Sequence, residues 1–300
     1  MSSKDTLQRF LFENISIRGE LTQLHKSWQA IIENHHYPAV VRDVLAQMLV
    51  AGVLLAATLK FKGRIILQIQ GKGSLPLVVA ECTSERAVRG LAHYSDDIQE
   101  ANLKNLVGEG QLAITLESEN KAERYQSIVE LTGDTVADAI EHYLETSEQL
   151  STRLWLKVDN ETAAGLLIQK LPPESVDEEN LHQLQQDNDG WNRIEQLSST
   201  IREDELLTLD ASEIIHRLYH EEDVRVFETE PVFFRCSCSR ERVANMLRGL
   251  GRDEVKSIIE EKNNISINCE FCNHLYEFDA VDAEQLFTDS LLSDNSPTQH

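Results

Sequence analysis

The sequence predicts an α+β protein in three parts, and three observations support this. Strand-like and helical runs alternate through residues 1–173, a strongly acidic stretch follows, and two close cysteine pairs lie near the C-terminus. We expect an N-terminal mixed α/β-sheet domain over 1–173, an acidic helical linker over 174–230, a small cysteine-rich domain over 231–287 and a flexible tail over 288–300. With 41% hydrophobic and 26% charged residues, the chain can bury a core.

The first part begins with helical patterns and continues with strands. Apolar spacing predicts a helix from Glu20 to Ile32, and Pro38 is well placed to open a second helix that is apolar nearly all round. A further helix is expected over 134–150, with Asp134 near its cap. Five alternating or apolar runs predict strands over 64–70, 77–81, 110–116, 125–131 and 153–158. Strands before and after a helix indicate an α+β domain.

The acidic part stands out by composition. Residues 174–230 hold 4 Lys and Arg against 17 Asp and Glu, a net charge of −13. This is more than half of the formal net charge of the chain, −23. The stretch 181–190 is polar and rich in helix breakers, while Asp210 and Glu213 resemble a capping box. Apolar residues recur at helical spacing: Ile194, Leu197, Ile201, Leu206, Leu207, Ile214, Ile215 and Leu218. Such short, charged helices need tertiary packing. Two interpretations stay open: an ordinary helical connector, or a segment that folds only against its neighbours.

Composition also excludes classes of function. A chain with a net charge of −23 lacks the basic face of a general phosphate-backbone binder and is poorly suited to anionic lipid. The most apolar stretch, Met48 to Leu59, is too short to span a bilayer, and the first residues lack an apolar signal core. We therefore expect a cytoplasmic protein that binds neither nucleic acid nor membranes.

Four of the five cysteines are clustered. Cys236 and Cys238 are separated by one residue, and 30 residues later come Cys269 and Cys272. In a cytosolic chain, two close pairs favour a tetrahedral zinc site with four thiolate ligands over structural disulfides, which makes residues 231–287 a four-cysteine zinc domain. Helices over 239–248 and 252–261 and a strand at 265–267 would bring the pairs together. The alternatives are unrelated buried cysteines, or His274 in place of one thiolate.

The remaining chemistry is sparse. Zinc holds sulfurs as thiolates, which oxidants attack, so the site is either a redox switch or a plain structural zinc. A domain of this size has little core, and losing its zinc would unfold it. Cys82 follows an apolar run and is expected to be a packed core thiol. We find no convincing catalytic constellation, so the chain is not expected to be an enzyme.

Several further motifs lie along the whole chain. They include Gln68-Ile-Gln-Gly71, Tyr143-Leu-Glu-Thr-Ser-Glu-Gln149, Phe234-Arg-Cys236-Ser-Cys238-Ser239 and Cys269-Glu-Phe-Cys272-Asn273. From about Asp5 to Phe287 the sequence resembles the redox-regulated heat shock protein 33 family, the bacterial 33 kDa chaperonins. The one-residue spacing of Cys236 and Cys238, unusual for a generic zinc knuckle, is typical of that family.

The resemblance implies a cytoplasmic, ATP-independent holdase that is inactive while reduced and bound to one zinc ion through Cys236, Cys238, Cys269 and Cys272. Oxidation would form the disulfides Cys236–Cys238 and Cys269–Cys272, release zinc and unfold the linker. The active form would be a homodimer that binds unfolding client proteins. The alternatives are a zinc-ribbon nucleic-acid-binding protein and a thiol–disulfide oxidoreductase that uses Cys269 and Cys272.

Overall fold

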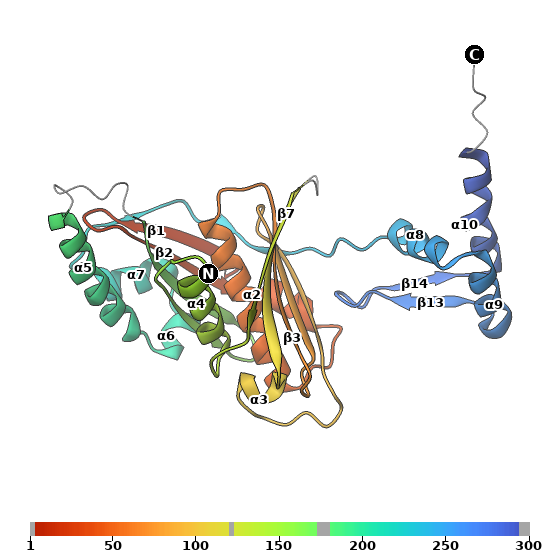
Figure 1. Cartoon of the computed structure of the whole chain (residues 1–300), viewed down its shortest axis with the longest axis horizontal. Coiled ribbons are helices and arrows are strands. Elements are labelled where there is room, and N and C mark those ends of the chain that lie inside the picture. Colours follow the sequence, from red (N-terminus) through yellow and green to blue (C-terminus); the bar gives the residue numbers. More distant parts are fainter. Residues whose placement is uncertain (1–3, 120–122, 173–180, 294–300) are drawn as a thin grey trace, which may run out of the picture. The chain divides into compact units, whose positions relative to one another are not determined.

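The computed structural model describes residues 4–119, 123–172 and 181–293, which form two compact units (Figure 1). The N-terminal unit extends to Arg235 and the C-terminal unit begins at Cys236. Helices of the acidic part, and residues 231–235 that we assigned to the cysteine-rich domain, thus lie in the N-terminal unit. The start of the acidic part, 174–180, lies outside the described residues. The functional division into domains stays a prediction.

The N-terminal unit contains two six-stranded sheets. The first sheet has the order β10-β1-β2-β9-β8, with β11 also paired to β1. Its strands are β1 (Thr6–Phe12), β2 (Ile17–Leu24), β8 (Thr152–Val158), β9 (Ala163–Lys170), β10 (Val224–Val226) and β11 (Glu230–Pro231). The second sheet has the order β12-β5-β4-β3-β6-β7. Its strands are β3 (Gly63–Gly71), β4 (Leu77–Thr83), β5 (Ala87–His93), β6 (Gly110–Ser118), β7 (Arg124–Glu130) and β12 (Phe233–Phe234).

Helix α2 (Ala39–Thr58) contacts strands of both sheets and forms the centre of the main core. By length and composition it could cross a membrane, but 72% of its most apolar 18-residue window is buried inside the fold. The helix is longer than the apolar run that the sequence suggested, and Pro38, which we expected in its first turn, lies one residue earlier as the N-cap. The helix has apolar residues on nearly all of its faces because it is buried between two sheets. Shorter helices α1 (Lys26–Ile32), α3 (Leu103–Val107) and α4 (Val136–Ser147) complete this core.

The prediction of a helix from Glu20 to Ile32 is wrong in its first part. Residues 17–24 form β2, and the helix begins only at Lys26, where the carboxylate of Asp5 accepts hydrogen bonds from the amides of His25, Lys26 and Ser27. Strand β2 is almost wholly buried although half of its residues are polar, and its two leucines lie at helical spacing with Trp28 and Ile31, which favoured a helix. Strand β9 is buried on both faces, so its apolar run lacks the alternation that reveals a strand; β1 and β5 were also missed.

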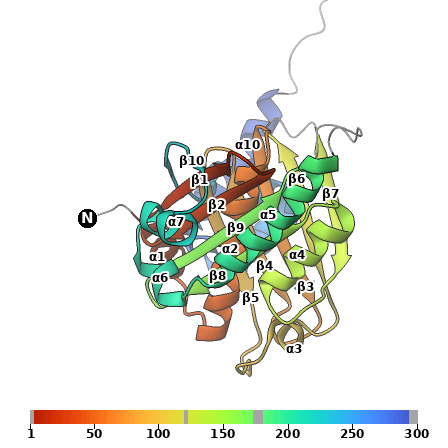
Figure 2. The same cartoon turned by 90° about the vertical axis from the view of Figure 1, so that its left-hand side faces the viewer.

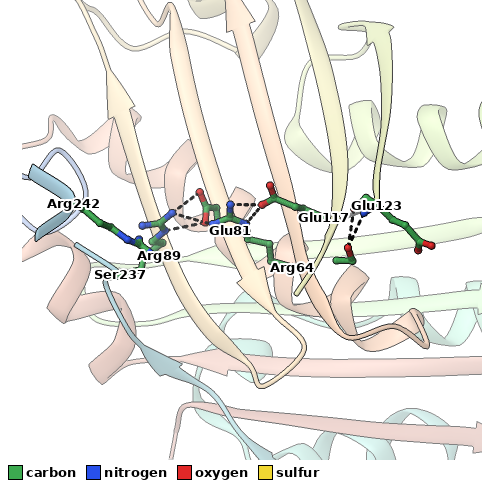
Figure 3. Close-up of polar contacts among 8 residues, drawn as sticks. Arg64, Glu81, Arg89, Glu117, Glu123, Ser237 and Arg242 are labelled. Carbon is green, nitrogen blue, oxygen red and sulfur yellow. Dashed lines mark hydrogen bonds and ion pairs between the residues drawn. The ribbon is translucent and has the colours of Figure 1, made fainter. Parts of the chain in front are cut away.

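The other predicted elements of this unit are confirmed with small shifts. All five predicted strands are present as β3, β4, β6, β7 and β8. Helix α4 spans Val136–Ser147, and its capping box uses Thr135 with Asp138 rather than Asp134. In the second sheet, Arg64 bridges Glu81 and Glu117, and Arg89 also pairs with Glu81 (Figure 3). This row of charges crosses four neighbouring strands and supports their register.

The acidic part forms helices α5 (Leu181–Ser199), α6 (Glu203–Thr208) and α7 (Ala211–Tyr219) over the outer face of the first sheet (Figure 2). The polar stretch 181–190 is helical, contrary to its breaker-rich appearance. The predicted capping box of Asp210 and Glu213 is confirmed. All eight apolar residues singled out in the sequence join one core cluster with strand residues, among them Phe10, Phe12, Ile17, Leu166 and Ile168. The helices therefore fold against their neighbours.

The C-terminal unit has a small core of its own. It contains α8 (Arg240–Leu250), α9 (Arg252–Lys262), a hairpin of β13 (Ile265–Asn268) and β14 (Leu275–Phe278), and α10 (Ala280–Ser293). The two predicted helices and the predicted strand are confirmed. Of the expected flexible tail, residues 288–293 belong to α10 and 294–300 lie outside the described residues.

Candidate metal centre

The first cysteine pair lies in the extended chain that leads into α8. Ser239, directly after Cys238, caps this helix by accepting a hydrogen bond from the amide of Arg242 at 3.2 Å. The cap ends the extended chain at a defined point. Cys236 and Cys238 are therefore presented by a short segment whose far end is held by the helix.

The second pair lies in the turn between β13 and β14. The amide of Asn273 donates to the carbonyl of Cys269 at 2.7 Å, and the amide of Cys269 donates to the carbonyl of His274 at 2.9 Å. Asn273 adopts a left-handed conformation with φ 55°, which asparagine tolerates better than most residues. The tight turn brings Cys269 and Cys272 to the same end of the hairpin.

All four Sγ atoms lie within 4.8 Å of one another. The Sγ atoms of Cys236 and Cys269 are 3.6 Å apart, and those of Cys238 and Cys272 are 3.4 Å apart. Four sulfurs at about 2.3 Å from a tetrahedral zinc would be about 3.8 Å from one another. The cluster thus has the ligand type, number and spacing that fit such an ion, and it could hold a metal ion.

The environment favours a negative sulfur at Cys238. Burial alone would raise the pKa of this thiol, but hydrogen bonds from Tyr276 and the neighbouring thiols outweigh it and lower the pKa. The Tyr276 hydroxyl donates to Cys238 Sγ at 3.1 Å. Burial and the neighbouring thiols raise the pKa of Cys272, and burial is the main reason that the pKa of Cys236 is also raised. Without a cation, a negative charge on one sulfur disfavours a second negative charge on its neighbours. A bound cation would stabilise all four thiolates.

The alternatives that the sequence left open for the cysteines can now be compared with the geometry. The pairs form one cluster, so they are not unrelated, and among the described residues His274 is not part of the group. Its ring instead packs edge-on against Tyr276, with centroids 4.7 Å apart. Cys269 and Cys272 lie in a turn between strands, not at the helix N-terminus that activates thiols in oxidoreductases.

Cys82 is separate from this cluster. Its side chain is fully buried on β4 in the main core, and burial raises the pKa of its thiol to about 12. It is the packed core thiol that the sequence indicated. Sequence reasoning did not assign a role to Tyr276, although its residue type and nearness to Cys272 in the chain were the available signals.

The comparisons with known proteins agree with one another. The family model of the Hsp33 protein matches residues 5–279. A 33 kDa chaperonin of Nitrosococcus oceani is 46% identical over the full length of both chains, and one of Pseudomonas aeruginosa is 42% identical, again over both full lengths. One of Chromobacterium violaceum is 45% identical over 96% of this chain and 95% of its own.

A solved structure shows the same fold. The crystal structure of the 33 kDa chaperonin of Thermotoga maritima matches with a TM-score of 0.79 at 22% identity, covering 96% of this chain and 99% of that chain. The family match, the relatives' shared name and the cysteine cluster point to one conclusion. The chain belongs to the Hsp33 family of 33 kDa chaperonins, and its function is that of a chaperone rather than an enzyme.

Proposed function

We propose that this protein is a redox-regulated, ATP-independent holdase of the cytoplasm. In the reduced state, Cys236, Cys238, Cys269 and Cys272 would hold one zinc ion and the chaperone would be inactive. The observation that carries the proposal is the cluster of four sulfurs within 4.8 Å of one another. A bound zinc ion would neutralise the thiolates and tie the hairpin to the segment before α8.

Oxidation of the thiols would remove the metal ligands. In each pair, Cys236 with Cys238 and Cys269 with Cys272, an S–S bond forms as the two thiolates lose two electrons. Hydrogen peroxide takes up these electrons and two protons from the solvent, its O–O bond breaks, and two molecules of water result. The sulfurs of a disulfide lie about 2.05 Å apart, so they no longer span a tetrahedral ion.

The small core of the C-terminal unit supports coupled unfolding. Its buried apolar residues are only Ala244, Leu247, Val255, Ile265, Tyr276, Phe278, Ala283 and Leu286 among those described. A core of this size contributes little stability by itself, so the unit would depend on its metal site.

The packing of α5–α7 supports the proposed client binding. These helices cover apolar residues of the first sheet, including Phe10, Phe12 and Ile17. Their release would expose both partners of this contact, and exposed apolar surface binds unfolding proteins. The high negative charge would keep the opened form soluble, and we expect it to be a homodimer that binds neither nucleic acid nor membranes.

The test is aggregation of a thermally unfolding client in the presence of the zinc-loaded reduced protein and of the peroxide-treated protein. We expect protection only after oxidation, together with zinc release measured by a chromogenic chelator and loss of helix by circular dichroism. Equal protection by the reduced, zinc-loaded protein would refute the redox switch. Sedimentation of both forms tests the homodimer.

Tryptic mapping tests the disulfide pairing. Cleavage after Arg235 and Arg240 gives one peptide with the first pair, and no Lys or Arg follows Lys262, so the second pair is also on one peptide. The proposed pairing predicts two separate peptides, each lighter by two hydrogens. A cross-linked species joining the two peptides would contradict it.

A further inference from the structure

The chain that joins α7 to the first cysteine forms edge strands on both sheets. We call residues 224–235 the bridging segment. Its strands β10 and β11 pair with β1 at the edge of the first sheet, and β12 pairs in parallel with β5 at the edge of the second. Cys236 follows directly. The bridging segment is therefore the covalent connection between the cysteines and α5–α7.

Backbone hydrogen bonds hold the end of this segment on two sides. The amide of Val232 donates to the carbonyl of Asp5 at 2.9 Å, and the amide of Phe233 donates to the carbonyl of Arg86 at 3.1 Å. Val232 is buried in the main core and Phe234 packs against it. The residues just before the cysteines are thus built into the N-terminal unit.

Arg86 makes the most buried ion pair to the bridging segment among the described residues. Its Nε lies 3.0 Å from Glu230 Oε2, and its Nη1 donates to the carbonyl of Ala56, near the end of α2, at 3.2 Å. The other oxygen of Glu230 lies 2.7 Å from Arg9 Nη2 on β1. The Arg86 side chain is only 10% exposed and that of Glu230 is 27% exposed. Removing Glu230 leaves the buried Arg86 charge uncompensated, whereas removing Arg86 leaves Glu230 with Arg9 as its one remaining ion-pair partner among the described residues.

The backbone of Arg86 adds an independent observation. This residue lies in the turn between β4 and β5 with φ 65°, a left-handed conformation that glycine or asparagine adopts at lower cost. A side chain kept in an unfavourable backbone conformation points to a role for that side chain. Here the guanidinium binds Glu230 of the bridging segment and the Ala56 carbonyl of α2 directly. Glu230 in turn pairs with Arg9 of β1.

We propose that Arg86 is the positioning residue that keeps α5–α7 docked in the reduced protein, by holding Glu230 of the bridging segment. The inference rests on the proposed function, because it identifies the contact that sets the threshold for opening. Loss of the Arg86–Glu230 pair frees β11 and β12, and the opening then spreads through β10, which pairs with β1 between β11 and the C-terminal end of α7.

The test uses the full-length, reduced, zinc-loaded protein with the variants Arg86→Asn and Glu230→Gln. Asparagine suits the left-handed backbone and removes the guanidinium together with two methylene groups of the side chain. The control is Arg225→Gln, which removes the ion pair of Arg225 with Glu13 from the same segment, where the side chains are 54% and 37% exposed. Hydrogen exchange over 211–219 and protection of a client before oxidation are measured.

We expect exchange over 211–219 to be at least tenfold faster in both variants, with client protection already present before oxidation. Arg225→Gln should stay within twofold of the unmodified protein, and exchange in β3 and β6 should be unchanged in all. The double variant should exchange no faster than Glu230→Gln, because Glu230→Gln already removes both ion pairs of Glu230. Unchanged exchange over 211–219 in both single variants, or equal acceleration by Arg225→Gln, would overturn the assignment. If the unmodified protein protects a client equally with and without oxidant, the proposed function is overturned instead. The exchange rates over 211–219 still decide the role of Arg86 in that case.

Discussion

Replacing Ile194 by alanine tests whether the acidic helices are held by packing alone. Ile194 lies on α5, is fully buried and belongs to the core cluster between α5–α7 and the first sheet. Deleting most of a buried isoleucine side chain costs about 2–4 kcal/mol, through lost burial and the cavity left behind. We predict that α5–α7 are stable only while packed, so this cost should fall on their docking.

The expected effect is a shift in the docking equilibrium. A loss of about 2–4 kcal/mol increases the undocked population by about 30- to 700-fold. The reduced Ile194→Ala protein should therefore show faster hydrogen exchange over 194–219, bind a hydrophobic dye and protect a client without oxidant. Exchange in β2 and β9 should change much less, because their sheet contacts remain.

Ile140→Ala is the matched control. Ile140 is also fully buried, but it lies on α4 in the main core around α2. The same deletion there should lower the melting temperature of the N-terminal unit without selective exchange over 194–219. If Ile194→Ala leaves that region protected, or accelerates β2 and β9 equally, the helices are not a separately docked layer.

Three further predictions concern buried groups. Burial raises the pKa of Glu20 from 4.5 to about 7 and outweighs the attraction of Arg18. The folded state therefore binds the proton of Glu20 more tightly than the unfolded state does, and the free energy of unfolding falls as the pH rises from 4.5 to about 7. Glu20→Gln should gain about 3 kcal/mol in urea unfolding at pH 8 and little at pH 4; an equal gain at both would contradict this. Buried Cys82 should resist alkylation by iodoacetamide in the reduced native protein, as measured by mass spectrometry, and rapid labelling would show that the core opens. Gly190→Ala should lower the melting temperature although alanine favours helices, because its Cβ would lie 2.7 Å from Ile15 Cγ2; a higher melting temperature would mean that Ile15 moves aside.

Local patterns succeeded where the physical cause is local. The strands at 64–70 and 110–116 were predicted because apolar residues of the main core alternate along them with more polar residues. The capping box at Asp210 and Glu213 depends on neighbours three residues apart. The strand at 17–24 was misjudged because pairing with β1 and β9, far apart in the sequence, overrides its local preference.

The sequence by itself determined the family, the α+β class, the acidic composition of the central part and the four cysteines suited to a metal. Each depends on residue type and spacing along the chain. Only the tertiary structure decided that Tyr276 donates to Cys238, that α5–α7 cover the first sheet, and that Arg86 and Glu230 form a pair. Partners such as Arg86 and Glu230, 144 residues apart, meet because strand pairing and burial bring them together, and no local pattern encodes that approach.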